Sequence, residues 1–294
     1  MRRSFTIQLV AALLLAGSVW AVDVKMASHL GSFAWRHNTE WFGGFSAIHL
    51  SDDGGSAIVL SDRATVLSVR FQRDGVEIKD VQILGHWPVL SSTGRIMLGY
   101  AGDSEGIAVA PDGSFFVSFE GVHRVAYYSA PGTNARVLPR PQVFDELDRN
   151  GSFEGLAIDG QGRLYTLTEK NRTVQRNIPV YRWDGQSWST PFVLPPRDGF
   201  LPVAADFDPD GRFYVLERKV TLTGFRTRLR RWQIESDTPV AEETLFETGT
   251  GTHDNLEGLS VWRDNQGVLR ATMVSDDNFI GLQRTEIVEY ALPD

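Results

Sequence analysis

Three Glu-Gly pairs recur in the chain and are the first candidates for chemistry. Glu105, Glu154 and Glu257 each precede a glycine and a short apolar run. Carboxylates brought within a few ångströms of one another cannot all stay ionised without a counter-charge. A hard cation such as Ca²⁺, which takes about six to eight oxygen ligands, would supply that charge. If the three glutamates converge, we expect them to be metal ligands and catalytic carboxylates.

Two aspartates extend this candidate metal site. Asp276 opens an Asp-Asp-Asn run near the end of the chain. Asp206 lies three residues after Val203, the residue that stands where the other copies have glutamate. Gly44 takes the same place in the first copy, so we expect the acidic set to be interrupted at Gly44 and Val203.

Basic side chains accompany the acids and predict a site for an anionic group. Arginine and lysine beside metal-bound carboxylates suit a phosphate, through charge-assisted hydrogen bonds. The candidate substrate-binding residues are Arg63, Lys170, Arg218, His253 and Arg284. The competing interpretation is structural, because a repeated glutamate can instead bond the backbone or an arginine of the neighbouring unit. For the nearby acids Asp62, Glu120 and Glu169, that structural interpretation is the favoured one.

The elements that must position these residues follow from an internal repeat. Segments beginning at Ser104, Phe153 and Pro202 superpose without gaps, and two further copies begin at Gly43 and Leu256. The turn glycines Gly113, Gly162 and Gly211 are 49 and 49 residues apart. Each copy has an apolar run, a turn with Asp or Gly and a second apolar run, which is typical of a β-hairpin.

About four strands per fifty residues is the size of a propeller blade. We therefore predict an all-β fold, a β-propeller with five blades favoured and six as the alternative. A β-sandwich would not explain the equal spacing. The run Glu286–Ala291 and either Val22–Met26 or Ser32–Trp35 are expected to close the ring.

The first 21 residues differ from the rest. Arg2 and Arg3 precede an apolar run from Ile7 to Val19, and Val19-Trp20-Ala21 resembles a cleavage site. This pattern predicts a secretory signal peptide at 1–21 and a single domain at 22–294. We expect a periplasmic or secreted protein with no membrane span after cleavage, and the sequence leaves the export route open.

Composition excludes several functions. The chain has no cysteine, which excludes disulfides, thiolate metal sites and a cysteine nucleophile. A formal net charge of −8 argues against a nucleic-acid partner. We expect a monomer that takes a small anionic or ester substrate.

The order of these motifs resembles a known family. DSEGIAV, SFEGLAID, PDGRFYVLERK, DNLEGLSVW and VSDDNF with QRTEIVEY are similar to the phytase-like, "esterase-like activity of phytase" proteins of exported bacterial type. The resemblance spans nearly the whole mature chain. It implies a β-propeller that hydrolyses phosphate or other esters, with metal and phosphate bound at an acidic channel mouth by Glu105, Glu154 and Glu257.

Three functions compete at this stage. The first is a Ca²⁺-assisted phosphoester or ester hydrolase. The second is a lactonase of the gluconolactonase type, with which Asn255 and Asn278 are compatible. The third is a non-catalytic propeller that binds a ligand or an envelope protein at its channel mouth.

Overall fold

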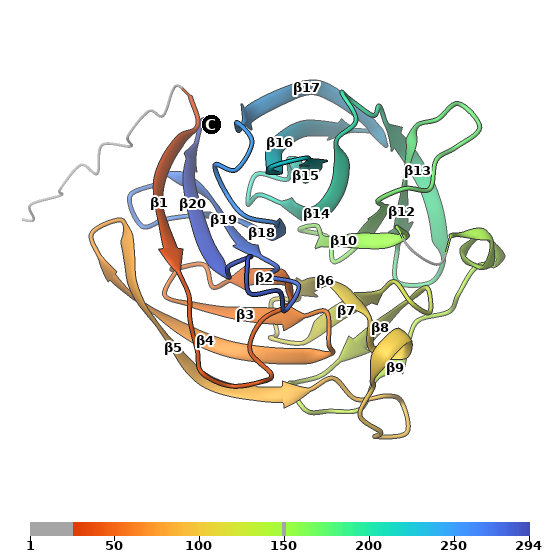
Figure 1. Ribbon diagram of the computed structural model, residues 1–294. Coiled ribbons are helices and arrows are strands. Elements are labelled where there is room, and N and C mark those ends of the chain that lie inside the picture. Colours follow the sequence, from red (N-terminus) through yellow and green to blue (C-terminus); the bar gives the residue numbers. More distant parts are fainter. Residues whose placement is uncertain (1–25, 149–150) are drawn as a thin grey trace, which may run out of the picture.

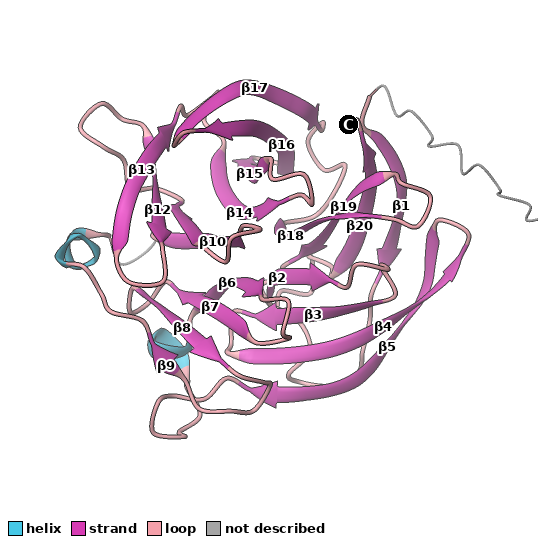
Figure 2. Ribbon diagram, turned by 180° about the vertical axis from the view of Figure 1, so that it is seen from behind, coloured by secondary structure: helices cyan, strands magenta, loops and turns pink. Residues whose placement is uncertain are grey.

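Five four-stranded antiparallel sheets surround a central channel in the computed structural model, which describes residues 26–148 and 151–294. Figure 1 shows the sheets arranged as the blades of a propeller around the channel. In the described residues, helix is limited to two short 3₁₀ turns, η1 (Gly99–Gly102) and η2 (Gln142–Glu146). Strands dominate the molecule (Figure 2). The all-β propeller prediction is confirmed, with five blades and not six.

Each blade runs in chain order from the channel outward, apart from the last. Blade 1 is β2 (Phe45–Leu50), β3 (Ser56–Ser61), β4 (Thr65–Asp74) and β5 (Glu77–Pro88). Blade 2 is β6 (Ser104–Val109), β7 (Phe115–Phe119), β8 (Arg124–Tyr128) and β9 (Arg136–Val137). Blade 3 is β10 (Phe153–Ile158), β11 (Leu164–Thr168), β12 (Ile178–Trp183) and β13 (Trp188–Leu194).

The remaining two blades complete the ring. Blade 4 is β14 (Leu201–Phe207), β15 (Phe213–Thr221), β16 (Gly224–Glu235) and β17 (Thr238–Glu247). Blade 5 is β18 (Leu256–Arg263), β19 (Leu269–Ser275), β20 (Glu286–Leu292) and, as its outer strand, β1 (Ser28–Ala34).

The N-terminal strand closes the ring. β1 pairs antiparallel with β20, with Phe33 opposite Ile287, and the two strands lie side by side in Figure 1. This confirms the prediction that the segment containing Ser32 and the C-terminal run share one blade. Residues 22–25 of the other candidate segment, like the predicted signal peptide at 1–21, lie outside the described residues. No helix among the described residues is long and apolar enough to cross a membrane.

The material between blades 1 and 2, considered in the sequence as a sixth blade, forms a loop. It contains a single bridge between Leu90 and Ile96 and then η1. The core lies between the blades, where apolar side chains from both faces of each sheet are buried. Val59, Val117 and Val215, on the second strands of three blades, have no exposed surface.

Candidate functional site

The strand register defines which residues are equivalent in the five blades. In every blade the pairing of the first strand with the second is interrupted by one extra residue near the start of the first strand. Such an insertion bends the strand and redirects the extra side chain. The five inserted positions form what we call the inner-strand ring: Ser46, Glu105, Glu154, Val203 and Glu257.

This register corrects one sequence assignment. Phe45 pairs with Ser61 as Ser104 pairs with Phe119, so Ser46 and not Gly44 is the equivalent of Glu105. The assignment of Gly44 was wrong because the two glycines before Phe45 resemble a Glu-Gly pair in spacing only. Ser46 Oγ donates to the Ser104 carbonyl at 2.7 Å, so blade 1 contributes a neutral hydroxyl to the ring. Val203 is confirmed as the apolar member.

The glycine after each glutamate has a packing role that the sequence did not reveal. A Cβ on Gly155 would lie 2.6 Å from the Ala205 nitrogen of the next blade. A Cβ on Gly106 would lie 2.7 Å from the Leu156 nitrogen, and one on Gly258 would lie 2.9 Å from Ala47 Cα. The Glu-Gly pair therefore combines a side chain at the channel with the close approach of two blades.

A second set of equivalent positions lies on the second-strand side, one residue after the partner of the residue that precedes each insertion. We call it the second-strand ring: Asp62, Glu120, Glu169, Arg218 and Asp276. Four blades supply a carboxylate here and blade 4 supplies an arginine. Glu217, the residue before Arg218 in the chain, pairs with Pro202 and is not a member of this ring. It is fully buried and bonds Arg228 and Arg230.

Arg218 connects three blades at this end of the channel, which we call the acidic mouth. Its guanidinium lies 2.8 Å from Glu169 of blade 3 and forms an ion pair with Glu257 of blade 5. It also donates to Asn255 Oδ1 at 2.6 Å, and Asn255 donates to Glu257 at 2.9 Å. Burial lowers the pKa of Arg218, but the charges of Glu257, Glu154 and Glu169 outweigh it and raise the pKa further above its ordinary value.

The charges of carboxylates in the two rings shift one another's pKa values across blades, so these side chains lie close enough to interact. Burial, and then the charges of Glu154 and Glu257, raise the pKa of Glu105 well above its ordinary value. Burial, and then Glu169 and Glu120, do the same for Glu154. Burial also raises the pKa of Glu257, against the opposing effect of Arg218.

Carboxyl groups of the second-strand ring also have raised pKa values. Burial, against the opposing charge of Arg63, raises the pKa of Asp62 to about 6. Burial, reinforced by Glu257, raises the pKa of Asp276 to about 8. Carboxyl groups with such pKa values are typical of a site that holds protons or a cation.

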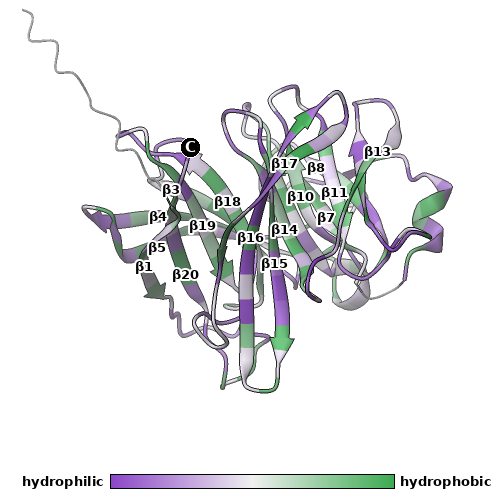
Figure 3. Cartoon of the chain, turned by 90° about the horizontal axis from the view of Figure 1, so that it is seen from above, coloured by the Kyte–Doolittle hydropathy of each residue, from purple (hydrophilic) through white to green (hydrophobic). Residues whose placement is uncertain are grey.

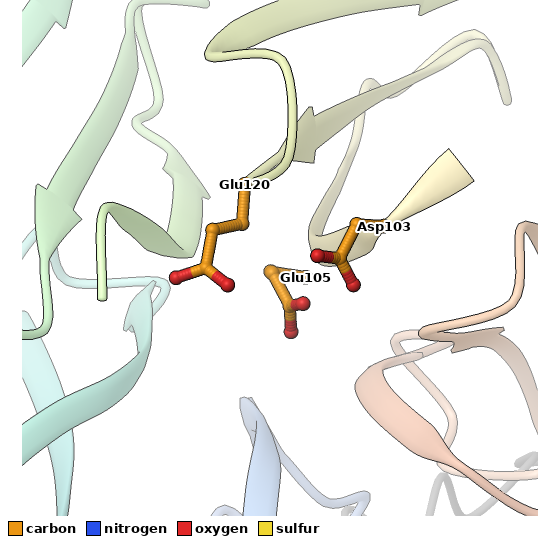
Figure 4. A group of neighbouring side chains, drawn as sticks. All are labelled: Asp103, Glu105 and Glu120. Carbon is orange, nitrogen blue, oxygen red and sulfur yellow. The ribbon is translucent and has the colours of Figure 1, made fainter. Parts of the chain in front are cut away.

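Three carboxylates of blade 2 form the tightest cluster. Ligand oxygens of Asp103, Glu105 and Glu120 all lie within 4.8 Å of one another. Figure 4 shows the three side chains next to each other at the start of β6 and the end of β7. One oxygen of Glu120 already accepts a hydrogen bond from Ser152 at 3.0 Å. Asp103 is the member that sequence reasoning missed, although it directly precedes the Ser-Glu-Gly motif.

The predicted basic residues separate into two groups. Arg63 is exposed at the acidic mouth, with its guanidinium 3.2 Å above the centre of the Phe279 ring. Lys170 lies 2.9 Å from Glu169. His253 is buried away from the rings, where it bonds the Tyr290 hydroxyl at 2.8 Å, and burial lowers its pKa to about 4.

Arg284 lies on the acidic side but further from the axis, because it precedes β20, the third strand of blade 5. Its guanidinium bonds Glu286 at 3.0 Å. Asp206 is not part of either ring. It stands near the far end of β14, where its carboxylate accepts a hydrogen bond from the Val261 amide at 2.7 Å and burial raises its pKa to about 7.

Asp206 lines a pocket of about 850 Å³ at the opposite mouth of the channel. All five blades contribute to this pocket through the turns that follow their first strands. Three of its carboxylates are paired with arginines: Asp159 bonds Arg163, Asp208 bonds Arg212 and Asp210 bonds Arg263. The acidic mouth, with at least seven carboxylates around one ring arginine, is the place where charge is unbalanced, so we place the candidate site there.

Comparison with known proteins identifies the family. The sequence matches the Phytase-like family, described as "Esterase-like activity of phytase", over residues 40–279. The chain belongs to this family. The family resemblance drawn from the motifs is thus confirmed. No curated protein matches the sequence.

Several solved structures are similar to this chain at low sequence identity. An aldose sugar dehydrogenase from Streptomyces coelicolor, solved with PQQ bound, is 12% identical, with a TM-score of 0.48 over 92% of this chain and 100% of that one. A gluconolactonase from Xanthomonas campestris is 17% identical, with a TM-score of 0.43 over 85% of this chain and 72% of that one. A protein of unknown function from Dyadobacter fermentans is 9% identical, with a TM-score of 0.47 over 92% of this chain and 100% of that one.

Proposed function

We propose that this phytase-like propeller hydrolyses phosphoester or other ester bonds at its acidic mouth with the assistance of Ca²⁺. The observation that carries the proposal is the cluster of Asp103, Glu105 and Glu120, whose oxygens lie within 4.8 Å of one another. Membership of the "Esterase-like activity of phytase" family supports the same class of reaction.

The donor set fits a hard cation. The three side chains offer oxygen and no nitrogen or sulfur, which suits Ca²⁺ better than Zn²⁺. Glu154 of blade 3 and Glu257 of blade 5 raise the pKa of Glu105 further, so a cation there would relieve their mutual repulsion. A bound divalent cation polarises an ester or phosphoryl oxygen and lowers the pKa of a coordinated water.

The remaining ring residues have roles that their environments support. Glu154 is buried, with a pKa raised towards the range in which a carboxyl group can both accept and donate a proton, so we assign it general acid–base function. Arg218 is held by Glu169 and Glu257 and fixes their orientation. Arg63, exposed at the mouth, is available to meet the anionic part of a substrate.

The test is turnover on a panel of phosphomonoesters, phosphodiesters and carboxylic esters, with added Ca²⁺ and with chelator. We expect activity that chelator abolishes and that Glu154→Gln lowers by about a hundredfold or more, the usual contribution of a positioned acid or base. The matched control is Glu77→Gln, a change of the same kind at an exposed residue of blade 1. We expect this variant to retain full activity.

A folded protein that turns over no ester would refute the hydrolase and favour the ligand-binding alternative. Turnover restricted to lactones would favour the lactonase. Activity that survives both chelator and Glu105→Gln would remove the metal from the proposal and leave the reaction class standing.

A further inference from the structure

Exposed apolar side chains are concentrated on the face that carries the acidic mouth. Fourteen large apolar residues of the described chain are exposed, and ten of them lie in the connections between strands on this face, including the two 3₁₀ turns and the end of β15. The loops are those that lead into a first strand or that join a second strand to a third. The ten residues are Ile96, Leu98, Tyr100, Val122, Val143, Val174, Val220, Leu222, Ile280 and Leu282.

The opposite face differs. Its turns consist mainly of Asp, Gly and other polar residues, as at 51–55, 111–114, 159–163 and 264–267. Among the exposed apolar residues, Met26 and Val76 lie beside strand ends on that face, Met26 before β1 and Val76 between β4 and β5. Since the two faces are built from the same repeat, this asymmetry is not a consequence of propeller geometry.

Basic residues flank the apolar residues in four of the loops. Leu222 and Val174 are almost completely exposed, and so is Leu282. Each of these three residues has an arginine or a lysine within three positions along the chain. The four loops carry Arg95 with Ile96 and Leu98, Arg172 and Arg176 with Val174, Lys219 with Val220 and Leu222, and Arg284 with Ile280 and Leu282.

The loop between β15 and β16 extends furthest. Both strands are long, and their connected ends project beyond the neighbouring strands in Figure 3. Leu222 lies at the tip of this hairpin and Lys219 lies at its base, where its ammonium donates to the Asp198 carbonyl at 2.8 Å. A hairpin with an apolar residue at its tip and a cationic residue behind it is suited to insert its tip into the headgroup region of a bilayer.

We propose that these four loops dock the propeller on an anionic lipid bilayer, with the acidic mouth facing the membrane surface. The apolar tips are separate residues spread around a ring, so they suit a soft planar surface better than a protein partner, which requires a contiguous complementary patch. The flanking bases complement lipid phosphates. The inference is independent of whether the mouth hydrolyses esters.

The acids of the mouth would repel an anionic bilayer, but they are buried or half-buried, so the exposed tips of the four loops meet the lipid first. Glu154 and Glu169 are buried, and Glu169 is paired with Arg218. The loop at Val143 contains Asp145 and Glu146, and its flanking base, Arg140, is paired with Asp145 at 2.7 Å, so we exclude this loop from the docking surface. Val122 is excluded because it has no exposed arginine or lysine beside it.

The test is co-sedimentation with vesicles of phosphatidylcholine and phosphatidylglycerol in about a 2:1 ratio, compared with pure phosphatidylcholine. The twenty strands of the described residues lie between residues 28 and 292, so a chain that begins at Val22 keeps all of them and removes the apolar run at 7–19. We expect partition into the anionic vesicles that falls with added salt. The double variant V174D/L222D should lower the partition coefficient by about tenfold.

The matched control is V76D/L84D, which makes the same change at two exposed residues away from the acidic face. It should bind within about twofold of wild type, and circular dichroism verifies that both variants are folded. Equal loss in the control would overturn the proposal, and so would equal binding to neutral vesicles. Absence of vesicle binding would overturn it too, and a concentration-dependent dimer in that case would assign the face to a second copy.

Discussion

The guanidinium of Arg218 lies 2.8 Å from the carboxylate of Glu169, at a position where each of the other four blades has a carboxylate. It also pairs with Glu257 on its other side, so one cation of blade 4 connects the acids of blades 3 and 5. The site therefore depends on a single departure from the repeat. The excess of carboxylates that remains around it is the feature on which the predictions below depend.

Replacing Arg218 by glutamine should destabilise the protein by about 3 kcal/mol at neutral pH, because Glu257 would lose its counter-charge and Glu169 would keep only the ion pair with Lys170. Urea unfolding measures the change. R218Q combined with E169Q should recover part of the loss. The matched control is R36Q at an exposed arginine, with no measurable effect. Equal free energies of unfolding for R218Q and R36Q would contradict the role assigned to Arg218.

Metal-free protein should lose stability as pH rises from about 4 to about 8. The pKa of Asp276 rises from 3.8 to about 8 and that of Asp62 to about 6, so the folded state binds more protons than the unfolded state in this range. The stabilisation that each protonated carboxyl group contributes is complete below its pKa in the unfolded state. It disappears as the pH rises through the pKa of that group in the folded state. Melting temperature measured against pH in chelator shows the slope.

The D276N variant tests the assignment of this slope. It removes a group that must ionise while buried, so the loss of melting temperature with pH should become shallower. The control is D112N in an exposed turn, where hydrogen bonds from Ser114 lower the pKa of the carboxyl. Asp112 therefore affects the melting temperature only at pH values below about the ordinary pKa of aspartate. An unchanged slope in D276N would show that Asp276 is ionised throughout.

Ca²⁺ should raise the melting temperature at neutral pH and release protons on binding. At about a hundred times the dissociation constant, a ligand that binds only the folded state stabilises it by about 2.7 kcal/mol. E105Q should remove most of this shift, and E77Q, at an exposed residue of blade 1, should keep it. Calorimetry in buffers of different ionisation enthalpy detects the protons. A shift that persists in E105Q would place the ion elsewhere.

Gly155→Ala should cost about 1–3 kcal/mol, since the added Cβ would lie 2.6 Å from the Ala205 nitrogen and would push blades 3 and 4 apart. Gly160→Ala is the matched control in the same blade, because nothing lies within 4 Å of its Cβ position. Thermal unfolding of the two variants compares them directly. Similar melting temperatures would mean that the blades separate without cost at this point.

Glu217→Gln should be among the most destabilising single changes, by about 3–5 kcal/mol, because it leaves Arg228 and Arg230 without their shared counter-ion. Both Glu217 and Arg230 are fully buried. E235Q, at the exposed end of β16, is the control. Chemical denaturation compares the free energies of unfolding of E217Q and E235Q. A small loss of free energy in E217Q would indicate that water reaches the buried charges of Arg228 and Arg230.

Much of the site could be predicted from sequence because the repeat places equivalent residues in equivalent positions. Glu105, Glu154 and Glu257 occupy the same place in the repeat, and the charges of Glu154 and Glu257 act on Glu105, but the tight oxygen cluster around Glu105 is completed by Asp103 and Glu120. His253 shows the limit of this reasoning. Its neighbours in sequence are site residues, but the chain turns there and the ring packs against Tyr290 in blade 5.

The acids after the second strands were expected to be solvated or to bridge blades. The structure places them in a ring of their own, with Asp276 and Arg218 as members. The distinction depends on register: Glu217 and Arg218 are adjacent in sequence, yet one is buried with arginines and the other faces the channel. A one-residue step along a strand reverses the direction of the side chain, so composition cannot decide it.

The sequence by itself determined the propeller, its glutamate positions and its family, since a fifty-residue repeat of apolar runs and turns can bury its surfaces only by stacking like units around an axis. Only the tertiary structure decided which acids meet, which of them Arg218 neutralises and which face carries the exposed apolar loops. Those properties arise between blades, from side chains far apart in the chain, and the free energy of each charge depends on neighbours that the linear order does not specify.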